Sequence, residues 1–306
     1  MYPTGGRGGV LDGSQVDHLA SQGSLVRSGG MLVAVNAGDN TISVFGVHGD
    51  RPRRTQVLGS GGTFPVSVAV HGDLVYVLNA RDGGTIQGYL RLGRRLVPVR
   101  HWHRALGLDA HQTPEFTSTP GQVAFSPDGS RLIVTTKGNG NAIKVFPVGP
   151  RGPGRGVTTS DPEAVPFAVA FDPAGRLLVA EAGPNAVATF AMRRTGALRP
   201  RSRVATGQQG TCWITRSGDH VYTSNAGSGT VSAYRTTRGG LTAVGTTGTD
   251  DGTVDAAATT DGRYLYVQAG KAGNVDEFKI GANGALSRIG TVTVPGAQGG
   301  EGIVAS

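Results

Sequence analysis

The sequence has 306 residues, of which 51 are glycine and 16 proline, and only 16% of its residues are charged. Glycine and proline together stay below the roughly 25–30% that is typical of disordered low-complexity chains. No apolar stretch approaches the roughly 18 residues of a membrane helix, and residues 1–25 lack the pattern of a signal peptide. We therefore expect neither a membrane span nor an intact signal peptide in this chain.

The chain is basic, with 29 Lys and Arg residues against 21 Asp and Glu residues and a net charge of +8. Such a charge favours anionic partners. The arginines are dispersed, however, and neither of the densest clusters, 91–104 and 193–203, is a continuous basic run with interleaved aromatics. We therefore expect no nucleic-acid partner. The single cysteine, Cys212, excludes an intramolecular disulfide and is expected to be a small buried residue.

One unit recurs six times along the chain: a β-branched run, a Gly/Asn turn and a second, alternating run. The six copies cover residues 33–45, 75–89, 133–146, 178–190, 221–234 and 266–278. Their equivalent positions are Asn36, Asn79, Thr136, Glu181, Asn225 and Ala269, which are 43, 57, 45, 44 and 44 residues apart. Only the third copy therefore carries an insertion.

Each copy has the pattern of a β-hairpin, and a further short strand is expected on each side of it. Apolar runs precede most copies, as at 65–70 and 166–175, and Arg- and Thr-rich runs follow, as at 96–99. Four strands in roughly 44 residues are typical of one blade of a β-propeller, and no segment shows sustained helical periodicity. The sequence predicts an all-β fold, a β-propeller of four-stranded blades that forms one domain over residues 21–306.

A seventh blade is expected to be incomplete. Residues 300–305 match the first strand of a further repeat, but residues 1–20 contain only a polar, Gly-rich remnant in place of its other strands. Either the fold is a six-bladed ring with an orphan strand, or the chain begins inside a longer gene product whose upstream part held those strands and a secretion signal. We favour the second interpretation.

At these repeats the sequence resembles the seven-bladed lactonase family, which includes 6-phosphogluconolactonase and carboxymuconate cyclase. The similarity rests on the SPDG turn at 126–129, the NAG motifs at 36–38 and 225–227, and the blade period. It is similar above all to secreted actinobacterial members. The resemblance implies a propeller fold, lactone hydrolysis and an extracellular location.

The resemblance also implies a catalytic set of one His, an Arg-His pair and a Glu. In this sequence the first His is replaced by Gln122 and the Arg-His pair by Phe167-Ala168, whereas the Glu is matched by Glu181. Opening a lactone ring needs a general base for water and a donor for the developing oxyanion. We expect Glu181 to act as the base and Gln122 as the donor. The alternative is that Glu181 is a solvated carboxylate or only satisfies amides of its turn.

In a propeller, the interblade loops and the loops between second and third strands share the face that usually binds the ligand. The substrate-binding candidates on these loops are Arg81, Lys137, Phe167, Trp213 and Asp255. Other candidates there are Asp39, Phe64, Glu115, Phe116, Asn185, Asp251, Lys271 and Glu301. The alternative for Phe64, Phe167 and Trp213 is that they wedge between neighbouring blades.

The insertion in the third copy, residues 101–111, is a candidate lid through His101, His103 and His111. If the segment is extended, His101 and His103 point the same way, and Asp109, His111 or Glu115 could complete a metal shell with them. Because the spacing matches no firm ligand motif, a surface loop is the simpler interpretation. We expect no metal and no cofactor.

Two functions remain open from the sequence. The first is a hydrolase for a small, sugar-derived or anionic lactone. The second is a non-catalytic, exported propeller that binds a small molecule, a glycan or a protein partner at the same face. In either case we expect a monomer.

Overall fold

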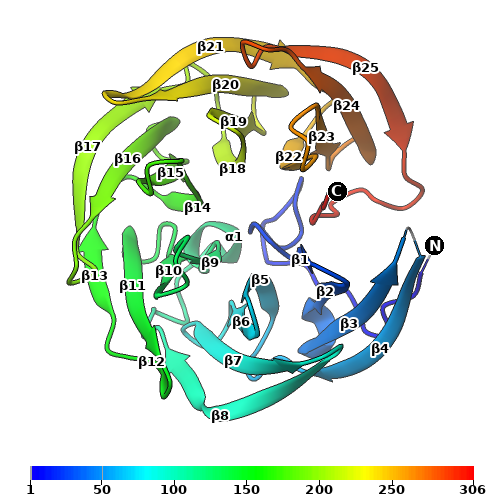
Figure 1. Cartoon of the computed structure of the whole chain (residues 1–306), viewed down its shortest axis with the longest axis vertical. Coiled ribbons are helices and arrows are strands. Elements are labelled where there is room, and N and C mark those ends of the chain that lie inside the picture. The colour runs from blue at the N-terminus through cyan, green and yellow to red at the C-terminus, as the bar shows by residue number, and fades with distance from the viewer. Residues whose placement is uncertain (1, 50) are drawn as a thin grey trace. The chain divides into compact units, whose positions relative to one another are not determined.

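A computed structural model describes residues 2–49 and 51–306 of the chain. In these residues it contains 25 strands, the short helix α1 (Glu115–Ser118) and the 3-10 turn η1 (Ala37–Asp39). The strands form six separate antiparallel sheets, which we number as blades 1 to 6 in chain order (Figure 1). Neither helical segment of the described residues is long and apolar enough to cross a membrane.

Blades 1 to 3 precede residue 161. Blade 1 is β1 (Leu25–Ser28), β2 (Met31–Asn36), β3 (Thr41–His48) and β4 (Arg51–Gly59). Blade 2 is β5 (Pro65–His71), β6 (Leu74–Asn79), β7 (Thr85–Leu92) and β8 (Arg95–Ala105). Blade 3 is β9 (Val123–Phe125), β10 (Arg131–Thr135) and β11 (Ala142–Gly149), with β12 (Gly152–Pro153) and β13 (Val157–Ser160) both paired to β11.

Blades 4 to 6 follow, each with four strands in chain order. Blade 4 is β14 (Pro166–Phe171), β15 (Leu177–Glu181), β16 (Ala186–Met192) and β17 (Leu198–Ala205). Blade 5 is β18 (Thr211–Ser217), β19 (His220–Asn225), β20 (Thr230–Thr237) and β21 (Gly240–Gly248). Blade 6 is β22 (Thr253–Ala258), β23 (Tyr264–Ala269), β24 (Asn274–Ile280) and β25 (Leu286–Thr293).

The second and third strands of each blade form the hairpins that the repeats predict. In blade 1, Asn36 pairs with Thr41 across a turn in which Asn40 has a left-handed φ of 59°, a conformation that Asn tolerates. In blade 5, Asn225 pairs with Thr230, and Gly229 supplies a φ of 60°. The middle strands are buried, whereas the fourth strands are mostly exposed, which explains why fourth strands such as β4 and β17 can carry three arginines each.

The chain divides into two compact units. Unit 1 holds residues 1–14 and 19–160 and thus blades 1 to 3, and unit 2 holds residues 15–18 and 161–306 and thus blades 4 to 6. The core of unit 1 lies between successive blades and includes Tyr76, on which Trp102 stacks with a ring-centroid distance of 6.1 Å. The core of unit 2 includes Tyr222 and Phe278, which lie between blades 5 and 6.

The predicted all-β propeller with four-stranded blades is confirmed. The structure assigns no strand to residues 300–305, so the first strand expected there is not formed. A strand needs a neighbour to pair with, and the backbone N–H of Ile303 donates instead to the side chain of Asp255. Residues 2–20 also form no strand. The segment nevertheless contacts blade 1, because the carbonyl oxygen of Thr4 accepts a hydrogen bond of 2.7 Å from the hydroxyl of Ser43 on β3. The single domain over residues 21–306 stays a prediction.

Candidate functional site

Glu181 is the last residue of β15 and is fully buried, with 0% of its surface exposed. Blades 1, 2 and 5 carry Asn at this position, as Asn36, Asn79 and Asn225. In blade 5 the amide of Asn225 donates to the hydroxyls of Thr230 and Ser232 on the facing strand, at 3.1 and 3.0 Å. Asn36 in blade 1 donates to Thr41 and Ser43 in the same way.

Blade 4 offers no such hydroxyls to Glu181. The facing positions on β16 are Ala186, which pairs directly with Glu181, and Ala188 two residues on. Because these side chains are small, Arg203 on β17, which pairs with Ala188, reaches across the strand to the carboxylate. Blade 4 therefore differs from blades 1 and 5 on three strands. Glu181 replaces Asn on β15, Ala186 and Ala188 replace Thr and Ser on β16, and Arg203 on β17 contacts the carboxylate.

Arg203 joins Glu181 to a second acid, Asp161, which directly follows β13. Its Nε lies 2.6 Å from Oε2 of Glu181, and its Nη2 donates to Oε1 at 3.2 Å. The same Nη2 donates to both carboxylate oxygens of Asp161, at 2.9 and 3.0 Å. The side chain of Arg203 is 48% exposed, whereas Glu181 lies behind it. The contact at Oε2 is a close ion pair without hydrogen-bond alignment, since this oxygen has no aligned donor in the described part of the chain.

Burial raises the pKa of Glu181 from 4.5 to about 7, because the charged form loses its hydration. Arg203 partly offsets this effect by favouring the carboxylate, while the nearby Asp161 adds to the increase. The result is a carboxyl group that changes its charge near neutral pH, with a guanidinium group in contact with it. A group of this kind can take up and return a proton at neutral pH.

The sequence singled out Glu181 but missed Arg203 and Asp161. Arg203 was visible only as one of several arginines in the cluster 193–203. The available signal was the pair Ala186 and Ala188, which replaces the Thr and Ser found in blades 1 and 5 and leaves an acid without hydroxyl partners.

Gln122 and Lys137 both belong to unit 1 and are buried. The backbone N–H of Gln122 donates to Oγ1 of Thr135 at 3.0 Å. The ammonium group of Lys137 donates to the carbonyl oxygens of Ala20 and Phe116, at 2.7 and 2.6 Å. Lys137 therefore ties loops of unit 1 together, and the roles of both residues in binding stay predictions.

Arg81 forms a bidentate ion pair with Glu115, with both contacts at 2.8 Å. Its guanidinium also lies 4.3 Å from the ring centre of Phe64. The hydrogen bonds from Arg81 hold the pKa of Glu115 below its usual range. Beside this pair is a cavity of about 20 Å³, room for about one water molecule, lined by loops 80–83 and 108–112. The cavity is too small for a substrate.

Phe167 and Trp213 are buried together in the core of unit 2, with ring centres 4.8 Å apart. This arrangement corresponds to the wedge between blades that the sequence left open as the alternative. Asp255, on β22, is also buried and accepts hydrogen bonds from the backbone N–H groups of Ala256 and Ile303. Burial, and secondarily the negative charge of Asp17, raise the pKa of Asp255.

The remaining loop candidates make local contacts. Asp39 accepts from the N–H of Arg7, Asn185 accepts from that of Thr211, and Lys271 forms an exposed ion pair with Asp251 at 3.5 Å. Phe116 contributes the carbonyl that Lys137 binds, and Glu301 lies beyond the last strand. None of these six candidates lines either of the two described pockets.

His101 and His103 lie on strand β8 and are both exposed, as expected for an extended segment. Trp102 between them is buried and fixes this part of the insertion against Tyr76. His111 lies in the exposed loop that follows, where its N–H donates to Asp109. Among residues 2–49 and 51–306, no three His, Cys, Asp or Glu side chains gather as metal ligands would. The lid role stays a prediction.

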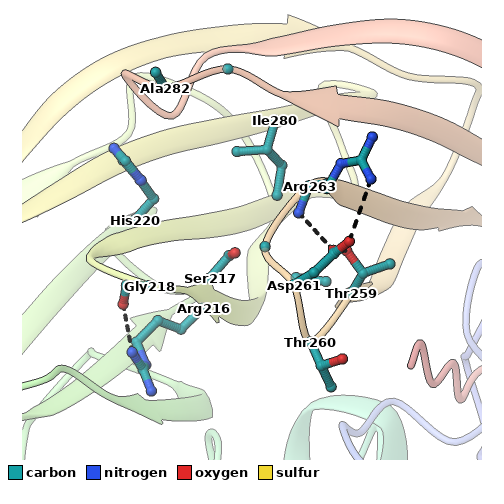
Figure 2. A pocket seen from close by; sticks show the side chains of 13 residues that line it. Arg216, Ser217, Gly218, His220, Thr259, Thr260, Asp261, Arg263, Ile280 and Ala282 are labelled. Atoms are coloured by element: carbon teal, nitrogen blue, oxygen red, sulfur yellow. Dashed lines mark hydrogen bonds and ion pairs between the residues drawn. The ribbon is translucent and has the colours of Figure 1, made fainter.

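A hollow of about 620 Å³ lies elsewhere in unit 2, between the turns 216–220, 258–263 and 280–282. These turns join first to second and third to fourth strands, so they are not the loops that the sequence favours. Figure 2 shows two interactions within these turns: Asp261 contacts Arg263, and Arg216 contacts the carbonyl of Gly218. The hollow shares no residue with the Glu181 cluster.

In a comparison with known protein families, residues 180–301 match the model "Lactonase, 7-bladed beta-propeller". This match confirms the resemblance. Residues 180–301 of the chain thus match a lactonase-family propeller. The matched segment includes Glu181 and Arg203 and ends in the region that follows blade 6. No curated protein matches the sequence.

Solved structures share the fold at low sequence identity. A putative 6-phosphogluconolactonase of Bacteroides fragilis is 21% identical, with a TM-score of 0.77 over 88% of this chain and 83% of that one. The periplasmic gluconolactonase of Pseudomonas aeruginosa is 18% identical, with a TM-score of 0.75 over 86% of this chain and 82% of that one. At these identities the likeness concerns the fold alone. Export and an actinobacterial source stay predictions.

Proposed function

We propose that this lactonase-family propeller hydrolyses a small lactone and that Glu181 is its general base. One observation carries the proposal: a fully buried carboxyl group whose pKa is raised to about 7 lies in contact with a half-exposed guanidinium group. The names of the B. fragilis and P. aeruginosa structures, a putative 6-phosphogluconolactonase and a gluconolactonase, favour a sugar-derived lactone.

The two groups have complementary tasks in the reaction. Glu181 takes a proton from a water molecule as that water attacks the lactone carbonyl carbon. Arg203 then stabilises the negative charge that develops on the carbonyl oxygen. When the bond to the ring oxygen breaks, Glu181 returns its proton to that oxygen, and the product is the open hydroxy acid. In this scheme Arg203 takes the donor role that the sequence gave to Gln122.

The exposure of the Arg203 and Glu181 side chains indicates the side from which a substrate reaches the site. Glu181 lies behind Arg203, so a substrate reaches the carboxylate from the exposed side of the guanidinium. Arg199 and Arg201 precede Arg203 on β17, and both are exposed. This concentration of positive charge favours a lactone with a carboxylate or phosphate group.

The test is lactone hydrolysis, followed by acid release over gluconolactone, 6-phosphogluconolactone and a muconolactone, with the spontaneous rate subtracted. Glu181→Gln removes the base and keeps the side-chain shape, so we expect turnover to fall by at least about 100-fold. Asp276→Asn is the matched control, because Asp276 is also 0% exposed and paired with a fourth-strand arginine. Equal turnover in the parent protein and Glu181→Gln would contradict the proposal.

The charged cluster in blade 6 favours a second function, that of a non-catalytic binding protein. Blade 6 contains an acid–arginine–acid cluster, Asp250, Arg288 and Asp276, that resembles the cluster in blade 4. If both clusters only hold their blades together, the chain is a non-catalytic propeller that binds a small molecule, a glycan or a protein. Absence of turnover on every lactone, from protein shown to be folded by circular dichroism, would favour this function.

A further inference from the structure

The fourth strands of the blades carry an unusual charge distribution. The strands β4, β8, β12, β13, β17, β21 and β25 together contain ten arginines and no Asp or Glu. Because the whole chain has a net charge of +8, the rest of the sequence has a small negative balance. The positive charge of the protein is therefore concentrated on the outermost strands of its blades (Figure 1).

In unit 1 the fourth strands of blades 1 and 2 form one continuous surface. The side chain of Gln56 on β4 donates to the carbonyl of Leu96 on β8 at 3.0 Å and accepts from its N–H at 2.9 Å. Thr55 adds a hydrogen bond of 3.2 Å to the carbonyl of Arg94. We call these two strands, together with the end of β7 and the turn that joins it to β8, the arginine surface; its arginines are Arg51, Arg53, Arg54, Arg91, Arg94, Arg95, Arg100 and Arg104.

The guanidinium groups of the arginine surface are available to an anion. Six of the eight arginines are exposed, and none forms an ion pair with another residue that the structure describes. Their protein contacts are with neutral groups, for example from Arg54 to the carbonyl of Pro3 and from Arg104 to that of His103. In unit 2, by contrast, Arg203 and Arg288 are both paired with carboxylates.

Exposed aliphatic side chains lie among these arginines. Leu92 is 57% exposed, Val97 is 44% exposed and Val57 is 39% exposed. The one Phe, Tyr or Trp residue on these two strands, Trp102, is only 7% exposed. Nucleic-acid bases stack on exposed aromatic rings, whereas a lipid interface accepts aliphatic side chains next to basic ones. Guanidinium groups also bind phosphate oxygens in a bidentate manner.

We propose that the arginine surface docks the protein on a bilayer that contains anionic phospholipids. The arginines bind the lipid phosphates, and Leu92 and Val97 enter the interface beside them. This docking does not depend on the lactonase activity, because the Glu181 cluster belongs to unit 2 and none of its residues is part of the surface.

The test is co-sedimentation with vesicles of phosphatidylcholine that contain about one third phosphatidylglycerol, compared with pure phosphatidylcholine vesicles. We expect binding to the anionic vesicles only, with a loss between about 0.1 M and about 0.5 M NaCl. Arg53→Glu/Arg95→Glu should weaken binding by at least about tenfold, since each basic residue near the surface contributes substantially. Leu92→Ser should weaken it by about threefold or more.

The matched control is Arg199→Glu/Arg201→Glu, which changes the net charge equally on exposed fourth-strand positions of unit 2. We expect it to change vesicle binding by less than about threefold. Three outcomes would overturn the proposal: no binding of the parent protein to anionic vesicles, equal weakening in the two double variants, or tighter binding to single-stranded DNA than to vesicles. An unchanged affinity in Leu92→Ser would overturn it as well, because the surface would then act through charge alone.

Discussion

Blade 4 and blade 6 each bury one carboxylate beside an arginine from the fourth strand, but they satisfy it very differently. In blade 6, Asp276 accepts from Arg288, from Oγ1 of Thr291 at 3.0 Å and from the N–H of Asp250 at 2.7 Å. Asp250 in turn accepts from Asn274 at 2.7 Å. Every acid in this cluster therefore has several donors.

In blade 4, the ionised carboxylate of Glu181 has only Arg203 as a donor among the residues that the structure describes, because the facing residues are Ala186 and Ala188. The pKa of Glu181 is raised to about 7, whereas Arg288 and Asn274 hold the pKa of Asp250 below its usual range. The difference indicates that several donors favour the charged form of a carboxyl group in such a cluster. With few donors, burial dominates and raises the pKa.

The largest loss of stability is expected for Arg288→Leu. This change leaves two carboxylates of blade 6 without their cation, and Asp276 is fully buried. Breaking such a pair costs about 3 kcal/mol. Urea unfolding should show this loss at about pH 5 and about pH 8 alike, because Asp250, whose pKa is lowered, remains ionised over that range. Arg288→Lys is the control, and its free energy of unfolding should fall by less than that of Arg288→Leu. A loss below about 1 kcal/mol in Arg288→Leu would contradict the difference drawn between blades 4 and 6.

Arg203→Leu should give a loss that depends on pH. Near pH 8 the carboxylate of Glu181 is charged and loses its partner, so we expect a cost of about 3 kcal/mol. Near pH 5 Glu181 is protonated in the folded protein, and the cost should fall to about 1 kcal/mol. Equal losses at the two pH values, measured by urea unfolding, would mean that Glu181 stays ionised over this range, as Asp250 does.

Glu181→Gln should remove a pH dependence from the parent protein. Because folding raises the pKa of Glu181 from 4.5 to about 7, the folded state favours the proton. The stabilisation is complete below about pH 4.5 and is lost as the pH rises through about 7, a change of about 2 kcal/mol between about pH 5 and pH 8. Urea unfolding of Glu181→Gln should lack this decline. An unchanged slope would assign the pH dependence to other groups, of which Asp255 is the first to examine.

The smallest effect is expected for Lys271→Ala. Lys271 and Asp251 form an ion pair at 3.5 Å, but both side chains are more than half exposed. Exposed pairs contribute little, so the free energy of unfolding should change by less than about 0.5 kcal/mol. A loss comparable to that of Arg288→Leu would show that the number of donors and the burial do not decide which clusters matter.

The strands could be predicted from the sequence because one repeat supplies six copies of the same local signals. Glycine and asparagine mark the turns, and the buried runs mark the inner strands. Blade 3 departs from the pattern where its fourth strand splits at Pro153 into β12 and β13. Proline lacks the N–H that a strand pairing needs, but the sequence alone does not tell whether the strand ends or bends there.

The candidate site was predictable only in part. Glu181 stands out because it interrupts a series of Asn residues. Its partner could not be chosen among Arg199, Arg201 and Arg203, because a bulge between Thr189 and Phe190 shifts the register of β16 and β17. Lys137 was predicted to bind a ligand, but its hydrogen bond to Ala20 joins residues 117 positions apart. Such contacts depend on tertiary structure and leave no local signal.

The most direct test of the central claim is the pH dependence of kcat/KM for lactone hydrolysis. The account predicts an ascending limb with an apparent pKa of about 7, set by Glu181, and the loss of this limb together with turnover in Glu181→Gln. A limb near the ordinary value of 4.5, or a pH profile that Glu181→Gln shares with the parent protein, would contradict the assignment of Glu181 as the base.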